Sequence, residues 1–148
     1  MKLLIPIVLL AILSSNAFSE VESSRWYKSG SNWCLAEGFR KLCLPPDADV
    51  DSIDSDGVRF ELVHSEGMVF LIFWHDKSKA FSGSIGKDSR VALVERYEIQ
   101  GHEASTIRVG VSTVLEVAIG KSSMITLAGE EPEALNEIAD ALVRQWND

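Results

Sequence analysis

The amino-acid sequence predicts an α+β domain built mainly from an antiparallel β-sheet, with one amphipathic helix at the C-terminus packed on it. Two observations carry this prediction. Short apolar or alternating segments separated by turn residues succeed one another from residue 58 to residue 127, as is typical of strands. One stretch with helical spacing of its apolar residues then ends the chain. No repeat or low-complexity linker divides the sequence, so we expect one domain over residues 20–148.

The first nineteen residues have the composition of a secretory signal peptide. Lys2 provides a short positive region, and residues 3–13 form an apolar core. Cleavage is expected after Ser19 or, nearly as well, after Ala17. The core is too short to span a membrane, which needs about 20 apolar residues, and no cysteine follows it as a lipid anchor. We therefore expect an exported protein, in the periplasm or outside the cell.

The chain is acidic, with 14 basic and 22 acidic side chains. Loss of the signal peptide would remove one of the basic side chains and none of the acidic ones. Nucleic acid and anionic membranes attract concentrated positive charge, so neither is expected as a partner. The net charge suits capture of a basic protein instead.

A disulfide-linked β-hairpin is the first structural element expected. Cys34 and Cys43 are the two cysteines, and close spacing in an exported chain predicts that they pair. A type II′ turn at residues 38–39 would place these cysteines opposite each other at a non-hydrogen-bonded position. Such a disulfide would stabilise the fold by about 2–3 kcal/mol. The polar residues 20–30 before the hairpin are expected to be loosely held, with Trp26 and Tyr27 as anchors.

The strands of the main sheet follow a connection at residues 45–57, which is acidic and contains Pro and Gly. Residues 58–64 alternate and predict a half-buried strand, whereas residues 68–74 are apolar throughout and predict a central strand. After a loop at 75–90, strands are expected at 91–99, at 107–119 and at 124–127. The second of these would be one long strand bent at Gly110.

The helix opens at Glu130-Glu131-Pro132, where acidic residues favour the positive end of the helix dipole and Pro fits the first turn. Its apolar stripe consists of Leu135, Ile138, Leu142, Val143 and Trp146.

Metal and cofactor sites are not expected. Asp47, Asp49 and Asp51 match the first positions of a calcium loop, but Ser52 and Val58 occupy the positions that need Gly and Glu. This run is therefore interpreted as a solvated acidic loop. The three histidines, His64, His75 and His102, lack the spacing of a zinc site.

The stretch FSGSIGKDSR, residues 81–90, contains two short matches to catalytic motifs. Gly86-Lys87 is the core of a phosphate loop, but Phe81 occupies the place of the first glycine and a strand follows. Ser84 and Lys87 have the spacing of serine acyl-enzymes, but that chemistry needs both on one helical turn and the glycines disfavour a helix. The companion motifs are also missing. Neither activity is expected.

The same stretch belongs to a basic loop on an acidic protein. As a binding surface it would use Lys77, Lys79, Ser82, Ser84, Lys87 and Arg90. Its Ser82-Gly83 pair is similar to the Ser-Gly loops with which bacterial periplasmic lysozyme inhibitors enter their targets. That pattern continues Ser-Gly-x-x-Tyr, and Gly86 stands where the tyrosine would be, so no family is assigned. The simpler interpretation is a solvated connection between strands.

Three functions remain in order of preference. The first is a non-catalytic protein-binding protein, an inhibitor or immunity protein that neutralises a secreted toxin or a cell-wall hydrolase. The second is an envelope accessory protein that carries a lipid or a peptidoglycan fragment in the groove between sheet and helix. The third is a small hydrolase that uses Ser84 or Ser112 with His75, although the sequence has no G-x-S-x-G elbow.

Overall fold

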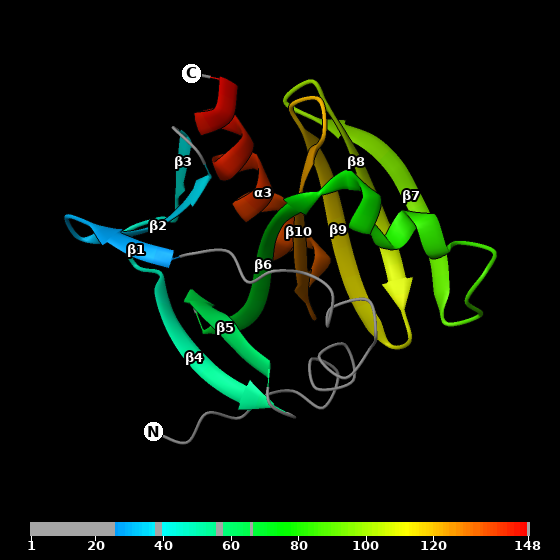
Figure 1. Ribbon diagram of the computed structural model, residues 1–148, viewed down its shortest axis with the longest axis horizontal. Coiled ribbons are helices and arrows are strands. Elements are labelled where there is room, and N and C mark those ends of the chain that lie inside the picture. Colours follow the sequence, from blue (N-terminus) through cyan, green and yellow to red (C-terminus); the bar gives the residue numbers. More distant parts are fainter. Residues whose placement is uncertain (1–25, 38–39, 56–57, 66, 148) are drawn as a thin grey trace.

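The computed structural model describes residues 26–37, 40–55, 58–65 and 67–147. The expected signal peptide at 1–19 and the expected turn at 38–39 lie outside the described residues. The predicted α+β class is confirmed: a three-stranded and a seven-stranded antiparallel sheet are packed with one C-terminal helix (Figure 1).

The elements have the following bounds. The three-stranded sheet contains β1 (Trp26–Ser29), β2 (Asn32–Glu37) and β3 (Arg40–Cys43). The larger sheet contains β4 (Asp49–Ser55), β5 (Val58–Ser65), β6 (Met68–Asp76), β7 (Val91–Ile99), β8 (His102–Val109), β9 (Ser112–Ile119) and β10 (Ser123–Gly129). Two 3-10 turns, η1 (Lys77–Lys79) and η2 (Phe81–Ser84), lie between β6 and β7, and the helix is α3 (Pro132–Asn147).

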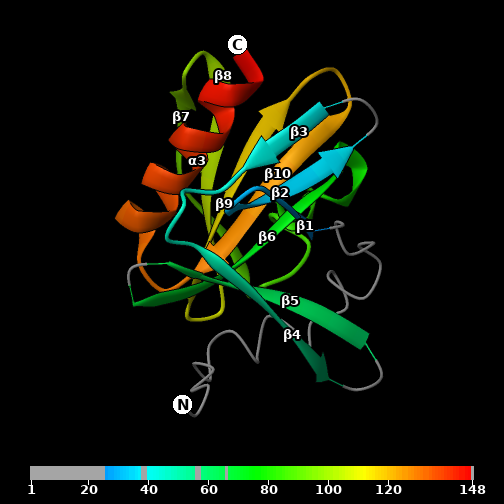
Figure 2. The ribbon, with the colours of Figure 1, turned by 90° about the vertical axis from the view of Figure 1, so that its left-hand side faces the viewer.

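The larger sheet joins two meanders. Its strand order is β4-β5-β6-β10-β9-β8-β7, and each neighbouring pair is antiparallel. Strands β6 and β7 therefore run parallel, with β10, β9 and β8 between them, and their connection must cross a face of the sheet. Figure 1 shows this green segment passing over the sheet, and Figure 2 shows β4 and β5 turning away from the remaining strands.

Each face of the sheet has its own core. Alternate residues of the central strands, such as Ile72, Leu115 and Leu127, pack with the buried stripe of α3 and with Leu35 and Leu42 of the small sheet. The opposite face packs Phe73, Val114 and Ile107 against Phe81 of η2. Strand β6 is thus covered on both sides, as its apolar sequence predicted.

The helix prediction is confirmed in its bounds and its stripe. Helix α3 begins at Pro132, and four of the five stripe residues are buried. The fifth, Trp146, packs edge-on against Trp74 with ring centroids 5.8 Å apart.

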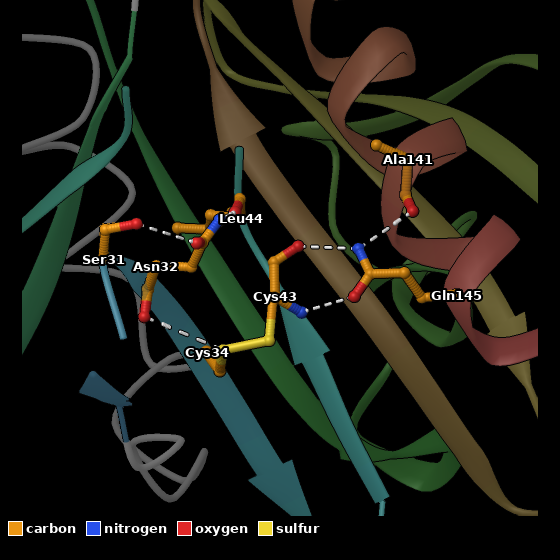
Figure 3. The surroundings of a disulfide bond; sticks show 7 residues. All are labelled: Ser31, Asn32, Cys34, Cys43, Leu44, Ala141 and Gln145. Carbon is orange, nitrogen blue, oxygen red and sulfur yellow. Dashed lines mark hydrogen bonds between the residues drawn. A yellow bond between two sulfur atoms is a disulfide. The ribbon is translucent and has the colours of Figure 1, made fainter. Parts of the chain in front are cut away.

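The hairpin prediction is also confirmed, together with its register. Cys34 pairs with Cys43 across β2 and β3, and the two sulfurs form a disulfide. The side chain of Gln145 extends from α3 to the outer edge of β3 (Figure 3). Its Oε1 accepts a hydrogen bond from Cys43 N at 2.7 Å, and its Nε2 donates to Cys43 O at 2.7 Å. This amide occupies the backbone groups that a fourth strand would use.

Two connections were predicted wrongly. Residues 49–55 of the expected acidic connection form the edge strand β4, which pairs with β5 along its length. The expected long strand 107–119 is a hairpin of β8 and β9, with Gly110 at φ 65° in the two-residue turn. Gly110 therefore reverses the chain instead of bending it, since a positive φ suits the first position of a type II′ turn.

Two further segments are more ordered than the sequence indicated. Residues 26–29, expected to be loosely held, form β1, and Trp26 packs against the first core. The loop 75–90 contains the end of β6 and both 3-10 turns.

Candidate functional site

Residues 77–90, the connection that crosses the sheet, are called the strap below. The strap is anchored by Glu116, a carboxylate in the middle of β9 that is only 1% exposed. Glu116 Oε2 accepts a short hydrogen bond from Phe81 N, and Oε1 accepts one from Ser82 N at 3.1 Å. Burial raises the pKa of Glu116, and the hydrogen bonds from Phe81 and Ser82 lower it in part. These two hydrogen bonds fix the position of the strap, because Phe81 N and Ser82 N would lose their acceptor if the strap moved away from Glu116.

Local sequence holds the rest of the strap in shape. Asp76 caps η1 by accepting a hydrogen bond from Ser78 N at 2.8 Å, and the Phe81 side chain is buried in the second core. Ser84 O then accepts from both Lys87 N and Asp88 N. Gly86 has φ +83°, which residues with a Cβ rarely adopt. The strap is therefore a preformed structure on a rigid sheet.

The basic end of the strap is tied to the β8–β9 turn. Arg90 O accepts a hydrogen bond from Gly110 N at 2.9 Å. Arg90 also pairs with Asp88, with 2.9 Å between Nη2 and Oδ2, and its hydrogen bonds lower the pKa of Asp88. The charge of Arg90 is therefore partly balanced within the strap. Lys87 is exposed, and among the described residues its side chain has no partner.

Exposed apolar side chains gather at the same corner of the sheet. Leu93 and Val94 on β7 are 38% and 56% exposed, and Val111 in the β8–β9 turn is 82% exposed. They are three of the four large apolar side chains exposed in the described part of the chain. Val94 lies in a bulge, because the pairing of β7 with β8 shifts register between Leu93 and Glu95. We call Lys87, Leu93, Val94 and Val111 the corner surface.

The predicted binding residues divide between the two ends of the strap. Lys77 and Ser82 are half-buried and line a cavity beside the first part of the strap. Ser84 is half-buried near the middle, whereas Lys87 and Arg90 are exposed at the far end. The side chain of Lys79 lies outside the described ones. The five residues with described side chains are therefore distributed along the strap, and their role in binding stays a prediction.

The groove between sheet and helix is filled over most of its length by apolar side chains from both sides. At its end, one cavity beside Met68, Gly129 and Leu135 measures about 160 Å³, and a more open one beside Met68, Ala134 and Glu137 measures about 360 Å³. The cavity beside the strap measures about 410 Å³. Sites for drug-sized ligands range from about 300 to 1,000 Å³, so the cavity beside the strap and the one beside Glu137 reach that size.

A hydroxyl–imidazole pair lies under the second face of the sheet. His75 Nε2 is 2.6 Å from Thr126 Oγ1, and His75 Nδ1 is 2.9 Å from Asp76 O. The carbonyl selects the tautomer with the proton on Nδ1, so the Thr126 hydroxyl donates to Nε2. This arrangement resembles an activated nucleophile, but Thr126 is 1% exposed and lines none of the cavities described above, so a substrate would not reach it. The pair satisfies the buried Thr126 hydroxyl and the half-buried His75 ring.

The acidic run does not form a calcium loop. Asp49 and Asp51 lie in the extended strand β4, where Asp49 Oδ1 accepts a hydrogen bond from Trp33 Nε1 at 2.9 Å. His64 Nε2 lies 3.2 Å from Asp51 Oδ2. Across residues 26–147, apart from the gaps given above, no three His, Cys, Asp or Glu side chains are grouped to hold a metal ion. In the same residues, no helix is long and apolar enough to cross a membrane.

Sequence reasoning missed Glu116 and the apolar part of the corner surface. The signal for Glu116 was present, since it is the one charged residue in the strand STVLEVAI. Comparison of the chain with protein-family models, with curated proteins and with solved structures gives no match.

Proposed function

We propose that this protein is a non-catalytic, exported binding protein that inhibits or neutralises a secreted toxin or a cell-wall hydrolase. The observation that carries the proposal is the corner surface: exposed apolar side chains on β7 and in the β8–β9 turn lie where Arg90 joins the strap to that turn, and the same end of the strap carries Lys87, whose side chain has no partner among the described residues. Interfaces commonly combine an apolar centre with a charged rim. A preformed loop loses little conformational entropy when it binds, so its contacts contribute more fully to affinity.

The net charge of the protein and the charge of Lys87 would act at different stages of binding. The protein as a whole is acidic and would attract a basic partner over a distance. Lys87 at the corner would instead contact an acidic group at the partner's binding site. Catalytic clefts of glycoside hydrolases contain paired carboxylates, which suit such a contact. The disulfide agrees with the oxidising compartments in which such enzymes act.

The test is binding and inhibition with a panel of purified secreted toxins and cell-wall hydrolases. We expect at least one enzyme to be inhibited, and Lys87→Glu to weaken its binding by about tenfold or more, because the substitution places a like charge against the partner's acidic group. Lys41→Glu is the matched control, because Lys41 is an exposed lysine on β3 of the other sheet. Val94→Ser should also weaken binding, whereas Tyr27→Ser on β1 should not.

Two results would contradict the proposal. One is the absence of inhibition across the panel. The other is a partner whose affinity responds equally to Lys87→Glu and Lys41→Glu, because its contact would then lie away from the corner surface.

A further inference from the structure

The cavity beside the strap has a polar lining of both charge signs. It is bounded by the first part of the strap and by strands β7 to β10, and Tyr97, Met124 and the three alanines at 80, 104 and 118 also line it. Its polar lining consists of Lys77, Ser82, Arg96, Glu103, Ser105 and Glu116. The cavity opens to solvent where Arg96 and Glu103 are exposed. This site is separate from the corner surface, which shares none of its lining residues.

Several of these polar groups lack a partner within the protein. In the described part of the chain, the side chains of Lys77, Arg96 and Glu103 form no ion pair or hydrogen bond. Lys77 is nevertheless half-buried. A partly desolvated charge without a partner is unfavourable, so a ligand that supplies the opposite charge would gain from meeting it.

The strand register arranges the charges in a row. Glu116 on β9 lies opposite Ser105 on β8, and Ser105 lies opposite Arg96 on β7. Directly opposed residues share a face of the sheet, and neighbouring strands are about 4.8 Å apart. The backbones of Glu116 and Arg96 are therefore roughly 10 Å apart, with the Ser105 hydroxyl between them. The row runs from a buried carboxylate to an exposed guanidinium.

We propose that this cavity binds a small zwitterion of about the size of a dipeptide. Its ammonium group lies toward Glu116, and its carboxylate lies toward Arg96. A carboxylate offers about four acceptor positions, and on Glu116 three are used by the backbone N–H groups of Phe81 and Ser82 and by the side chain of Ser82, which leaves one for the ammonium. Ser105 is placed to hydrogen-bond the centre of the ligand.

Ligands of a single charge fit this lining less well. An anion attracted by Lys77 and Arg96 would meet the repulsion of Glu103 and Glu116. A cation attracted by the two glutamates would be repelled by the two basic side chains. An uncharged apolar ligand would leave the side chains of Lys77, Arg96 and Glu103 without a partner and remove them from water, which is unfavourable.

The experiment is a titration of the isotope-labelled, oxidised protein with alanyl-alanine, followed by NMR and calorimetry. Two blocked peptides serve as matched probes: N-acetyl-alanyl-alanine lacks the ammonium, and alanyl-alanine amide lacks the carboxylate. We expect saturable shifts at the backbone amides of residues 82, 96, 103–105 and 116–118. Each blocked peptide should bind roughly tenfold more weakly or worse, because each loses a charge-assisted hydrogen bond.

Variants of the protein test which residue contacts each charged group of the ligand. Arg96→Ala should weaken binding of alanyl-alanine roughly tenfold and remove its advantage over the amide. Glu98→Gln is the control, since Glu98 lies two residues along the same strand, is exposed, and does not line the cavity. Because Glu116 also anchors the strap, its role is tested with the acetylated peptide on the unaltered protein.

The proposal is overturned if alanyl-alanine gives no saturable shifts, or if all three peptides bind alike. Shifts confined to the corner surface, or equal effects of Arg96→Ala and Glu98→Gln, would also contradict it. None of these measurements involves a protein partner, so their outcome is independent of the inhibitor proposal.

Discussion

Glu116 determines how the second face of the sheet is covered. It stands in a strand whose other side chains are apolar or small, and its carboxylate is hidden from solvent under the strap. A buried carboxylate costs free energy unless donors surround it. The backbone N–H groups of Phe81 and Ser82 supply those donors, and in return the strap is held at one position.

Glu116→Gln should loosen the strap. The amide retains one acceptor oxygen but places an NH₂ group against the second backbone N–H, which then lacks a partner. We expect the free energy of unfolding to fall by about 1–3 kcal/mol. Hydrogen exchange at the amides of residues 81 and 82 should become faster than in the unaltered protein. Glu103→Gln, an exposed substitution on β8, is the control. Unchanged exchange at both amides would show that the carboxylate does not hold the strap.

The small sheet is attached to the rest of the molecule through one of its edges. Strand β3 has a neighbour on one side only, and Gln145 of α3 fills the other side at Cys43. The same Gln145 Nε2 donates to Ala141 O at 3.1 Å, which keeps the side chain directed along the helix. The hairpin and the helix are thereby joined by backbone-like hydrogen bonds as well as by apolar packing.

Gln145→Ala should destabilise the protein by about 1–2 kcal/mol, because two hydrogen bonds to the β3 edge are lost. Urea unfolding followed by fluorescence measures the change. Among the described residues, the side chain of Arg144 forms only the exposed ion pair with Asp140. Arg144→Ala is therefore the control on the neighbouring residue and should cost about 0.3–0.5 kcal/mol. Equal effects of the two substitutions would mean that the Gln145 hydrogen bonds contribute nothing beyond helix propensity.

Removal of the disulfide acts on the same hairpin. The double variant Cys34→Ala/Cys43→Ala should lower the free energy of unfolding by about 2–3 kcal/mol, since the loop it closes is short. Addition of Gln145→Ala to that variant should cost less than it does in the oxidised protein if the hairpin frays without its disulfide. Strictly additive effects, measured by a double-mutant cycle, would show that the two attachments are independent.

At the scale of the whole molecule, the sheet separates two cores, and two titratable groups lie under the strap side. Burial lowers the pKa of His75 below 6.5, although the carbonyl and the charge of Asp76 oppose this. Burial raises the pKa of Glu116 above 4.5. The histidine therefore favours the folded state above pH 6.5, and this contribution is lost as the pH falls through and below that value. The contribution of Glu116 is fully present below pH 4.5 and is lost as the pH rises through its folded pKa.

These opposite signs predict how two variants differ in their pH dependence. Relative to the unaltered protein, His75→Gln should gain stability as the pH is lowered below 6.5. Only the unaltered protein has a histidine that is protonated more readily when the chain is unfolded, so only that protein is destabilised by this protonation. Glu116→Gln should lose stability relative to the unaltered protein as the pH is lowered from neutrality toward 4.5. Urea midpoints at several pH values measure both. Parallel profiles for the three proteins would contradict the assignment.

The sequence predicted the elements better than their arrangement. The register of the Cys34–Cys43 hairpin and the stripe of α3 follow from local spacing, and both are confirmed. Strand β4 was missed because its aspartates are common in loops, and its strand conformation depends on pairing with β5. The Glu116 site could not be predicted from the sequence. The strap lies over β9 because β10, β9 and β8 stand between β6 and β7, and local spacing does not reveal that strand order.

The crossing of the strap also sets a condition on how the chain folds. Each meander pairs residues that are close in sequence, but the seam between β6 and β10 joins Ile72 to Leu127. Such distant pairing slows folding, and it waits until the last strand has been supplied. Any form with this seam open exposes the unpaired edge of MVFLIFW, a segment of the kind that aggregates. The second meander, β7 to β10, therefore protects strand β6 of the first meander, because β10 pairs with the edge of β6 that is prone to aggregation.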